Sequence, residues 1–441
     1  MRRSTMRGWA ALAAAVLLLS TAAPAFAADH RWAPALGLED GDQLARPAVA
    51  TPDAPVDEVK PGGKENSLET ASPKAVPTAD PVKITSPSAV LMEARSGRVL
   101  YQKNAHERRN PASVTKIMTL IVAFDALRDG KVKLDDKVTI SEEAAEQIGT
   151  IIFADTGETF SFQELLLSVA VGSANDAAVA VAEHVAGSVE AFVQRMNAKA
   201  RELGMNDTQF MNPTGLSAEG HMTSAYDIAL MSRYAALNYP ELIKLTAIYG
   251  ADLQVPWRKN GPIFRLWNNN KLLTWYQGAD GLKTGWTELA GYCLAATAVR
   301  NDVRMISVIM GAESPKVRNA EAARLLDYGF ANYTSVEVAP ANKRFGPIQV
   351  ARGKLSKVEL VPRTAFGVSV AKGEQDKVKV EVKLPRRVTA PLTQFQPVGE
   401  IIATLDGKPI GRMELVTPVA IEEANLWEMI LQHMKGVFTL R

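Results

Sequence analysis

Three short motifs, far apart in the sequence, constrain this chain more than any other feature. S-x-x-K occupies residues 113–116, S-x-N begins 60 residues later at 173–175 (173 − 113 = 60), and K-T-G begins a further 110 residues on at 283–285 (283 − 173 = 110). Any one of them alone would carry little weight. All three in this order, each in a suitable local context, predict that the fold brings them to one site.

Ser113 and Lys116 are predicted to lie on one face of a helix. Residues 112–127 follow Pro111 and form a long apolar stretch that is free of Gly and Pro. Side chains three positions apart in a helix share a face, one turn apart. A serine hydroxyl needs an adjacent base to act as a nucleophile, and burial lowers the pKa of a lysine towards that of a usable base. Ser113 is therefore predicted as a nucleophile and Lys116 as its base, with the first-turn amides helping to stabilise an oxyanion.

A second S-x-x-K, at residues 369–372, is predicted to have no catalytic role. The surrounding residues 366–372 alternate in character as a β-strand does. Residues three apart in a strand point to opposite faces of the sheet, so Ser369 and Lys372 would not meet. The four-residue pattern is therefore weak evidence by itself, and its local context decides.

The K-T-G motif is predicted to lie on a strand that lines the site. A turn and a buried strand over residues 290–299 follow it. Gly285 would let another backbone or a substrate come close, while Lys283 would supply positive charge and Thr284 a hydroxyl for a substrate carboxylate. The alternative is an ordinary Lys-Thr pair in a surface hairpin.

The S-x-N motif precedes a predicted helix over residues 176–183. Ser173 and Asn175 are candidate catalytic residues because of the motif they complete. Serine and asparagine are also common helix N-caps, so a purely structural role for either residue remains the alternative.

Together with residues 91–100, 212–216 and 280–285, the motifs resemble those of low-molecular-mass penicillin-binding proteins, the serine-type D-alanyl-D-alanine carboxypeptidases of peptidase family S11. The resemblance extends from about Ala89 to the C-terminus. It implies that Ser113 is the acylated nucleophile and Lys116 its proton acceptor. It also implies further substrate and proton contacts from Ser173, Asn175, Lys283, Thr284 and Gly285, an oxyanion hole made by the backbone amides of Ser113 and Trp286, and an arginine, Arg318, near the substrate carboxylate.

Two positions depart from patterns seen in some members of that family. Asn269 stands where some members carry an arginine between two asparagines, and Trp286 stands where some carry a histidine after K-T-G. Both positions bear on recognition of the carboxylate and on the deacylation rate. Neither position changes the predicted nucleophile.

The resemblance implies an enzyme that removes the terminal D-alanine from peptidoglycan stem pentapeptides and is acylated by β-lactam antibiotics, with no cofactor. A DD-endopeptidase and a serine β-lactamase of the same superfamily are alternatives. Class A β-lactamases use a Glu in an E-x-x-L-N segment, and the one similar stretch here, residues 234–238, has Tyr234 in that place. A non-catalytic wall-binding protein is a further alternative, which the intact Ser113, Lys116 and Lys283 argue against.

Composition narrows the remaining possibilities. With 441 residues, 47% of them hydrophobic, the chain is long enough for two domains. The single cysteine, Cys293, excludes an internal disulfide, and five scattered histidines without H-x-x-x-H or C-x-x-C predict no metal site. A net charge of +2 gives no reason to expect nucleic acid as a partner. The oligomeric state stays open.

The N-terminal residues 1–27 are predicted to be a signal peptide: a basic start, an apolar core and a small-residue cleavage site at Ala25-Phe-Ala27. An uncleaved anchor is the alternative. Residues 28–85 are rich in Pro, Ala and acidic residues without periodicity, which predicts a disordered linker.

Two domains and a terminal helix are predicted after the linker. Residues 86–335, with strands at both ends and helices between them, indicate an α/β (α+β) catalytic domain whose antiparallel sheet is covered by helices. Residues 336–421, with short alternating strands and an excess of basic residues, indicate a small β-sandwich. Residues 422–441 form an amphipathic pattern, predicted to anchor the exported protein peripherally on the outer face of the cytoplasmic membrane. A helix docked on the β-domain is the alternative.

Overall fold

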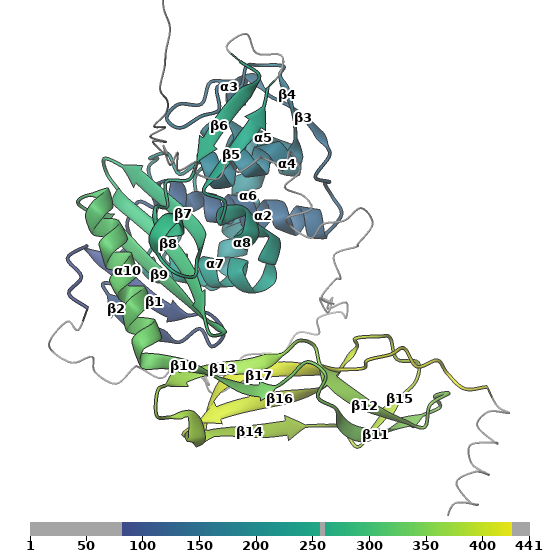
Figure 1. The fold of residues 1–441 in the computed structure, drawn as a ribbon. Coiled ribbons are helices and arrows are strands. Elements are labelled where there is room, and N and C mark those ends of the chain that lie inside the picture. The colour runs from purple at the N-terminus through teal and green to yellow at the C-terminus, as the bar shows by residue number, and fades with distance from the viewer. Residues whose placement is uncertain (1–81, 256–260, 426–441) are drawn as a thin grey trace, which may run out of the picture.

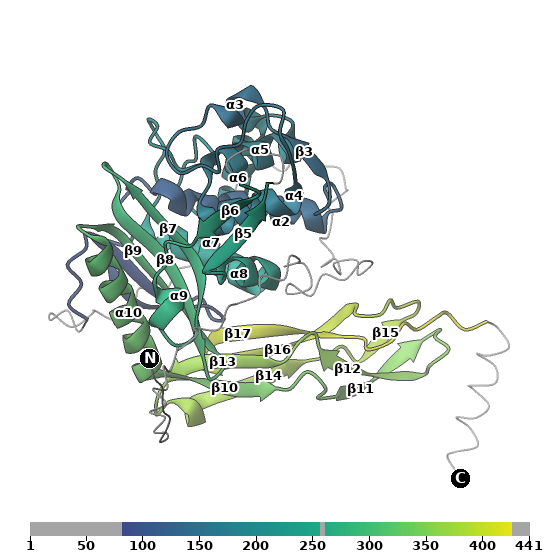
Figure 2. The same ribbon diagram turned by 45° about the horizontal axis from the view of Figure 1, so that its top comes forward.

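The computed structural model describes residues 82–255 and 261–425, which form two units joined where α10 (Pro315–Asn332) leads into β10 (Tyr333–Ala339) (Figure 1). The predicted signal peptide, most of the predicted linker and residues 426–441 of the predicted terminal helix lie outside the described residues. The first unit combines helices with a sheet, and the second unit contains mostly strands (Figures 1 and 2).

A five-stranded antiparallel sheet forms the base of the first unit, in the order β2-β1-β9-β8-β7. Its strands are β1 (Ser88–Glu93), β2 (Val99–Lys103), β7 (Ala279–Thr287), β8 (Gly291–Arg300) and β9 (Val303–Ala312). The first and last of these strands in the sequence, β1 and β9, pair with each other. The prediction of an antiparallel sheet built from both ends of the domain is therefore confirmed.

Helices cover both faces of this sheet. α10 (Pro315–Asn332) packs on β8 and β9 from one side, and α7 (Ala225–Asn238) packs on β1 and β9. The central helix α2 (Lys116–Arg128) is buried along most of its length. The other elements of this unit are η1 (Ala112–Thr115), α3 (Glu142–Ala145), α4 (Phe162–Leu167), η2 (Ser168–Gly172), α5 (Asn175–Ala186), α6 (Val189–Glu202), α8 (Pro240–Thr246) and α9 (Leu272–Trp275), with the strand pairs β3 (Lys137–Thr139) and β4 (Thr159–Ser161), and β5 (Gly250–Gln254) and β6 (Ile263–Trp267).

The second unit is a β-sandwich, as predicted. A six-stranded sheet runs in the order β14-β16-β17-β12-β11-β15, and a two-stranded sheet pairs β10 with β13. Phe366 and Val368 of the small sheet lie directly against Gly411 of the large one, so the two sheets share one core. The strands are β10 (Tyr333–Ala339), β11 (Phe345–Ala351), β12 (Lys357–Pro362), β13 (Phe366–Ala371), β14 (Val378–Lys383), β15 (Arg387–Thr389), β16 (Pro397–Leu405) and β17 (Lys408–Val416), with the short turn η3 (Gln375–Lys377).

Two predicted boundaries need correction. Val82 and Ile84 are buried in the core of the first unit, and the hydroxyl of Thr85 donates to the Glu321 carboxylate at 2.7 Å, so packed structure begins before residue 86. At the other end, Glu423 bridges to Gly353 as extended backbone. The terminal helix therefore does not include residues 422–425, because these residues add to the edge of the sandwich.

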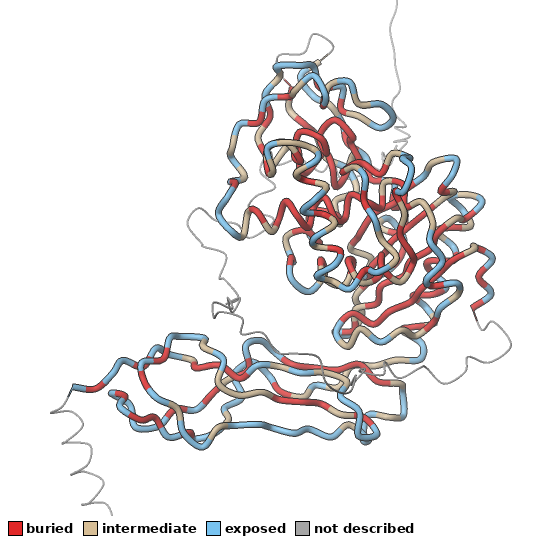
Figure 3. Tube along the Cα trace, turned by 180° about the vertical axis from the view of Figure 1, so that it is seen from behind, coloured by how far each residue is buried: buried red, intermediate tan, exposed pale blue. Residues whose placement is uncertain are grey.

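Burial follows the same division into two units. Figure 3 shows buried residues concentrated through the helices and sheet of the first unit and along the inner faces of the strands in the second. Within residues 82–255 and 261–425, no helix combines the length and apolarity needed to cross a bilayer.

Candidate active site

The predicted pairing of Ser113 with Lys116 is present. Ser113 lies in the 3₁₀ turn η1, and Lys116 begins α2 directly after it. Lys116 Nζ lies 3.2 Å from Ser113 Oγ. The predicted helix is thus a tight turn that leads into an α-helix, and it still puts both side chains on one face.

Lys116 is held by two further partners. Its Nζ donates to Asn175 Oδ1 at 2.6 Å and to the backbone carbonyl of Thr214 at 2.6 Å. The side chain is completely buried. Burial, reinforced by the nearby charge of Lys283, holds the pKa of Lys116 well below its ordinary value, and Asp176 opposes this shift only in part.

The S-x-N motif reaches the same amine. Asn175 is the first residue of α5, and its Nδ2 donates to the Ile148 carbonyl at 2.6 Å. The cap position of this helix is Ala174, which has no side-chain acceptor, so the N-cap alternative is wrong for both polar residues. Ser173 is 5% exposed and adopts a left-handed backbone conformation at φ 61°, immediately after η2.

The K-T-G strand is buried. Lys283 is 3% exposed and Thr284 5% exposed on β7, so the alternative of a surface hairpin is wrong. Burial and the charge of Arg318 lower the pKa of Lys283 to about 7. This lysine therefore changes its charge near neutral pH.

Gly285 lets β7 approach the turn that carries Ser113, η1 (Ala112–Thr115), which we call the nucleophile turn. A β-carbon at this position would lie 2.9 Å from the Ser113 amide nitrogen and 3.0 Å from the Pro111 carbonyl oxygen. Any side chain would push the strand away from Ser113, so the predicted close approach of two backbones is confirmed. The next residue, Trp286, is 56% exposed, and its ring lies 5.9 Å from that of Tyr292.

Arg318 lies near Lys283, in the first turn of α10. The side chain is buried, and its Nη2 donates to the Asn269 carbonyl at 3.4 Å. Burial lowers the pKa of Arg318 to about 10, so the guanidinium stays charged at neutral pH. The flanking Asn268 and Asn270 bond backbone carbonyls of Thr246 and Gly281, respectively, which fixes this segment beside β7.

Sequence reasoning missed the segment that presents Thr214. Asn212 Oδ1 accepts from the Thr214 amide at 3.2 Å and from the Gly215 amide at 2.7 Å, which folds residues 212–216 into a tight loop. Gly215 has a φ of 83° and lies against Ala112, where a β-carbon would clash. The resemblance to the family includes residues 212–216, but Thr214 contacts Lys116 through its backbone carbonyl, a group that every residue type has.

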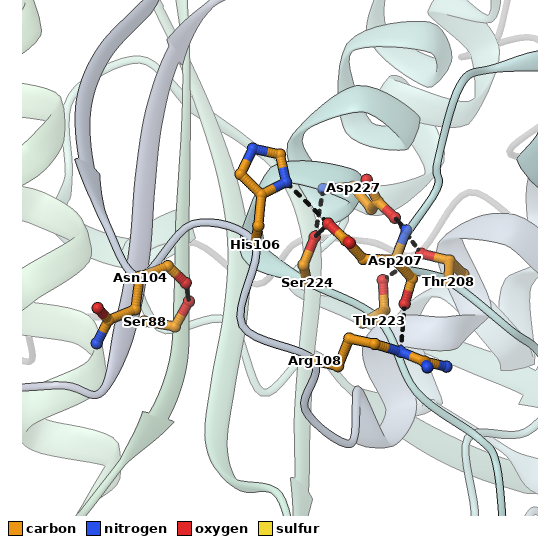
Figure 4. A network of polar contacts seen from close by, with 9 residues as sticks. All are labelled: Ser88, Asn104, His106, Arg108, Asp207, Thr208, Thr223, Ser224 and Asp227. Carbon is orange, nitrogen blue, oxygen red and sulfur yellow. Dashed lines mark hydrogen bonds and ion pairs between the residues drawn. The ribbon is translucent and has the colours of Figure 1, made fainter.

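A second polar network involves the residues that precede and follow this loop in the chain, at 207–208 and 223–227 (Figure 4). His106 Nδ1 lies 2.8 Å from Asp207 Oδ2, to which Ser224 Oγ also donates at 3.0 Å. Asp227 accepts from the hydroxyl of Thr208 at 2.7 Å. His106, the histidine closest to Ser113 in sequence, is therefore committed to Asp207, and it ties the segment before the nucleophile to the base of the loop.

Comparison with known proteins gives consistent matches. A profile described as D-alanyl-D-alanine carboxypeptidase matches residues 74–314, and one described as penicillin-binding protein 5, C-terminal domain, matches residues 333–423. The chain is 42% identical over 337 residues to D-alanyl-D-alanine carboxypeptidase DacF of Bacillus subtilis, covering 76% of this chain and 85% of that protein. It is 34% identical over 367 residues to DacC of Escherichia coli, covering 80% and 90%. The crystal structure of penicillin binding protein 5 from Haemophilus influenzae superposes with a TM-score of 0.61 at 34% identity, covering 78% of this chain and all of that one.

Proposed function

The chain belongs to the D-alanyl-D-alanine carboxypeptidase family, peptidase S11, and from that premise we propose how its side chains carry out the reaction. The protein is a serine-type D-Ala-D-Ala carboxypeptidase, a hydrolase of the penicillin-binding protein type. The residue roles that follow are our assignment, and they rest on the geometry around one amine.

The three neighbours of Lys116 carry the proposal. A neutral amine has two hydrogens and one lone pair. Asn175 Oδ1 and the Thr214 carbonyl, both at 2.6 Å from Nζ, take the two hydrogens. The lone pair is then left for Ser113 Oγ at 3.2 Å, so Lys116 is arranged to accept the hydroxyl proton as the oxygen attacks.

The attacked carbonyl joins the two terminal D-alanines of a peptidoglycan stem peptide. Its developing oxyanion would be bound by the amides of Ser113 and Trp286, which β7 and η1 bring together at Gly285. The terminal carboxylate would be recognised by Lys283, Thr284 and Arg318, which supply two cationic groups and a hydroxyl in buried positions.

The proton follows a closed route. Lys116 receives it from Ser113 and returns it, through the hydroxyl of Ser173, to the amine of the departing D-alanine as the C–N bond breaks. A water molecule then attacks the acyl-enzyme, giving its proton to Lys116 while the other hydrogen stays on the new carboxylic acid, and Ser113 regains its hydroxyl hydrogen from Lys116.

β-Lactam antibiotics would acylate the same serine. A β-lactamase of class A is disfavoured, because Tyr234 stands where that class needs its Glu. Tyr234 lies on α7, where its ring packs on Tyr239 and under the amine of Lys199 from α6. A DD-endopeptidase remains an alternative within the same family. A non-catalytic wall-binding protein is disfavoured, because the shift in the pKa of Lys116 suits a working base.

We also propose that the protein is exported through residues 1–27 and held at the outer face of the cytoplasmic membrane by its C-terminal residues. The apolar stripe of Trp427, Ile430, Met434 and Phe438 supports the second part. In this scheme the catalytic domain runs to about residue 335 and the sandwich domain to about residue 425.

The decisive experiment supplies the purified protein with a stem pentapeptide and measures free D-alanine. Release by the wild type and none by Ser113→Ala would support the carboxypeptidase assignment. Cleavage of cross-linked dimeric peptides without D-alanine release would instead favour an endopeptidase.

A further inference from the structure

His221, a buried histidine outside the three motifs, uses both of its ring nitrogens. The Met211 amide donates to Nδ1 at 3.1 Å, and Nε2 lies 2.9 Å from Thr115 Oγ1. The residue is 1% exposed, and its ring packs edge-on against Phe210. Because Nδ1 accepts a hydrogen bond, the ring hydrogen is on Nε2, and a neutral imidazole satisfies both partners.

The two partners of His221 belong to the two segments that surround Lys116. Thr115 immediately precedes Lys116 in the nucleophile turn, and Met211 begins the loop that presents the Thr214 carbonyl. One helical turn further along α2, Thr119 Oγ1 donates to the Pro213 carbonyl of the same loop at 2.6 Å. Apart from the bond of Lys116 to the Thr214 carbonyl, the loop is thus fastened at two points, to α2 through Thr119 and to the end of η1 through His221 and Thr115.

The two ends of the segment that contains this loop are held by backbone pairs. Gln209 and Met222 pair as extended backbone and close its base, and Thr223 pairs with Arg109 next to them. The network around Asp207 and Asp227 anchors the same stretch of chain through side-chain contacts (Figure 4). The loop that His221 contacts is therefore already held at its base, and the Thr214 carbonyl lies on the side of it that faces Lys116.

We propose that His221 is a positioning residue for acylation: it ties the 211–216 loop to the nucleophile turn, so that the Thr214 carbonyl stays on Lys116 Nζ and the lone pair stays directed at Ser113. The proposal rests on the roles assigned above to Ser113 and Lys116. Burial, helped by the charge of Lys116, lowers the pKa of His221 to about 4. The neutral bridge therefore persists over the whole neutral range, whereas a protonated ring would lose the acceptor for the Met211 amide.

Three substitutions test this role. In His221→Gln, an amide oxygen can accept from Met211 and its NH₂ can donate to Thr115, whereas His221→Phe fills the space without polar atoms. Thr115→Val removes the partner of Nε2 and leaves the histidine in place. The measurements are the rate of acylation by a fluorescent penicillin as a function of pH, and the melting temperature of each variant.

We expect His221→Phe to acylate on the order of 10- to 100-fold more slowly, because a small displacement of a catalytic group is enough for such a loss. The acid limb of its pH profile should move to higher pH, since a loosened loop admits water to Lys116 and relieves the burial that lowers its pKa. His221→Gln should stay within about threefold of the wild type, and Thr115→Val should resemble His221→Phe in both readouts.

The outcomes separate this inference from the proposed function. A wild type that is not acylated at Ser113 overturns the function and leaves nothing for His221 to position. If the wild type is acylated but His221→Phe keeps its rate, or loses only melting temperature with an unmoved acid limb, the residue is merely structural and the inference is wrong. Should His221→Phe fail to fold, Thr115→Val decides by the same two readouts.

Discussion

The S-x-x-K pattern occurs once in each unit of this molecule, but the two copies differ in backbone conformation and in the burial of the lysine. In η1 and α2, Ser113 Oγ and Lys116 Nζ lie 3.2 Å apart, and the lysine is completely buried. In the sandwich, Ser369 is buried on β13, whereas Lys372 is exposed just beyond the end of the strand. The same residues form a reactive pair only where the backbone turns as a helix does.

The two units also differ in what they bury. In the described residues the first unit buries charged and titratable side chains, among them Lys116, Asp176, Lys283 and Arg318. Over the same set, the polar residues that the sandwich buries are Ser369 and Thr417, both neutral hydroxyls. Burying a charge is costly unless partners compensate for the lost hydration. Because buried titratable groups cluster at functional sites, this contrast places the reactive groups in the first unit.

The difference between Ser113 and Ser369 leads to the strongest prediction. Ser113→Ala should abolish covalent labelling by a fluorescent penicillin, because it removes the attacking oxygen, and the melting temperature should change little. Ser369→Ala is the matched variant and should be labelled like the wild type. Labelling that survives in Ser113→Ala, or maps to Ser369, would show that the central assignment is wrong.

Next in size is the loss of carboxylate recognition. Lys283→Gln and Arg318→Gln should each lower kcat/KM on the order of 30- to 150-fold, since a charge-assisted contact to a buried anion is worth roughly 2–3 kcal/mol. Steady-state D-alanine release measures this loss. Lys372→Gln in the sandwich is the matched change of charge and should have no effect. A change of less than about threefold in Arg318→Gln would remove Arg318 from the site.

The activity should depend on pH because two buried lysines of the first unit, Lys116 and Lys283, must be in opposite charge states. Lys116 must be neutral to accept a proton, so kcat/KM should fall on the acid side as this amine becomes charged. Lys283, whose pKa is lowered to about 7, must be charged to bind a carboxylate, so kcat/KM should fall again as the pH rises above that value. Lys283→Arg should move the alkaline limb to higher pH. An unmoved limb would assign it to another group.

A truncation tests the predicted membrane anchor while leaving both units whole. Stopping the chain after Asn425 keeps the extended pairing of Glu423 with Gly353 and removes only the predicted anchor. The shortened protein should leave the membrane fraction and cleave small peptides at nearly the full rate, because the candidate site belongs to the first unit. Continued sedimentation with membranes, measured by fractionation, would contradict the proposed anchor.

The smallest effect concerns stability. Among the described residues the Ser369 hydroxyl is buried without a hydrogen-bond partner. Removing an unsatisfied buried hydroxyl spares its desolvation cost, so Ser369→Ala should leave the free energy of unfolding unchanged or raise it by up to about 1 kcal/mol. Urea denaturation measures the difference. A loss of more than about 1 kcal/mol would mean that the hydroxyl has a partner after all.

Local sequence patterns were enough to predict which motif residues pair and where several helices and strands lie. Three-residue spacing in an apolar stretch placed Ser113 with Lys116, and alternation placed Ser369 on a strand, because side-chain direction follows local backbone geometry. The short alternating patterns over residues 336–421 likewise predicted strands such as β14. These conclusions needed only neighbours within a few positions.

How the three motifs meet depends on the packing of segments that are distant in the chain. The Thr214 carbonyl on Lys116 and the contact between Gly285 and the nucleophile turn are made by backbone atoms, which every residue type shares. The fall in the pKa of Lys283 and the neutral state of His221 come from burial by segments distant in the chain. The packing of distant segments decides how deeply each group is buried and which charges lie near it. The sequence therefore identifies the reactive groups, and the fold shifts their pKa values.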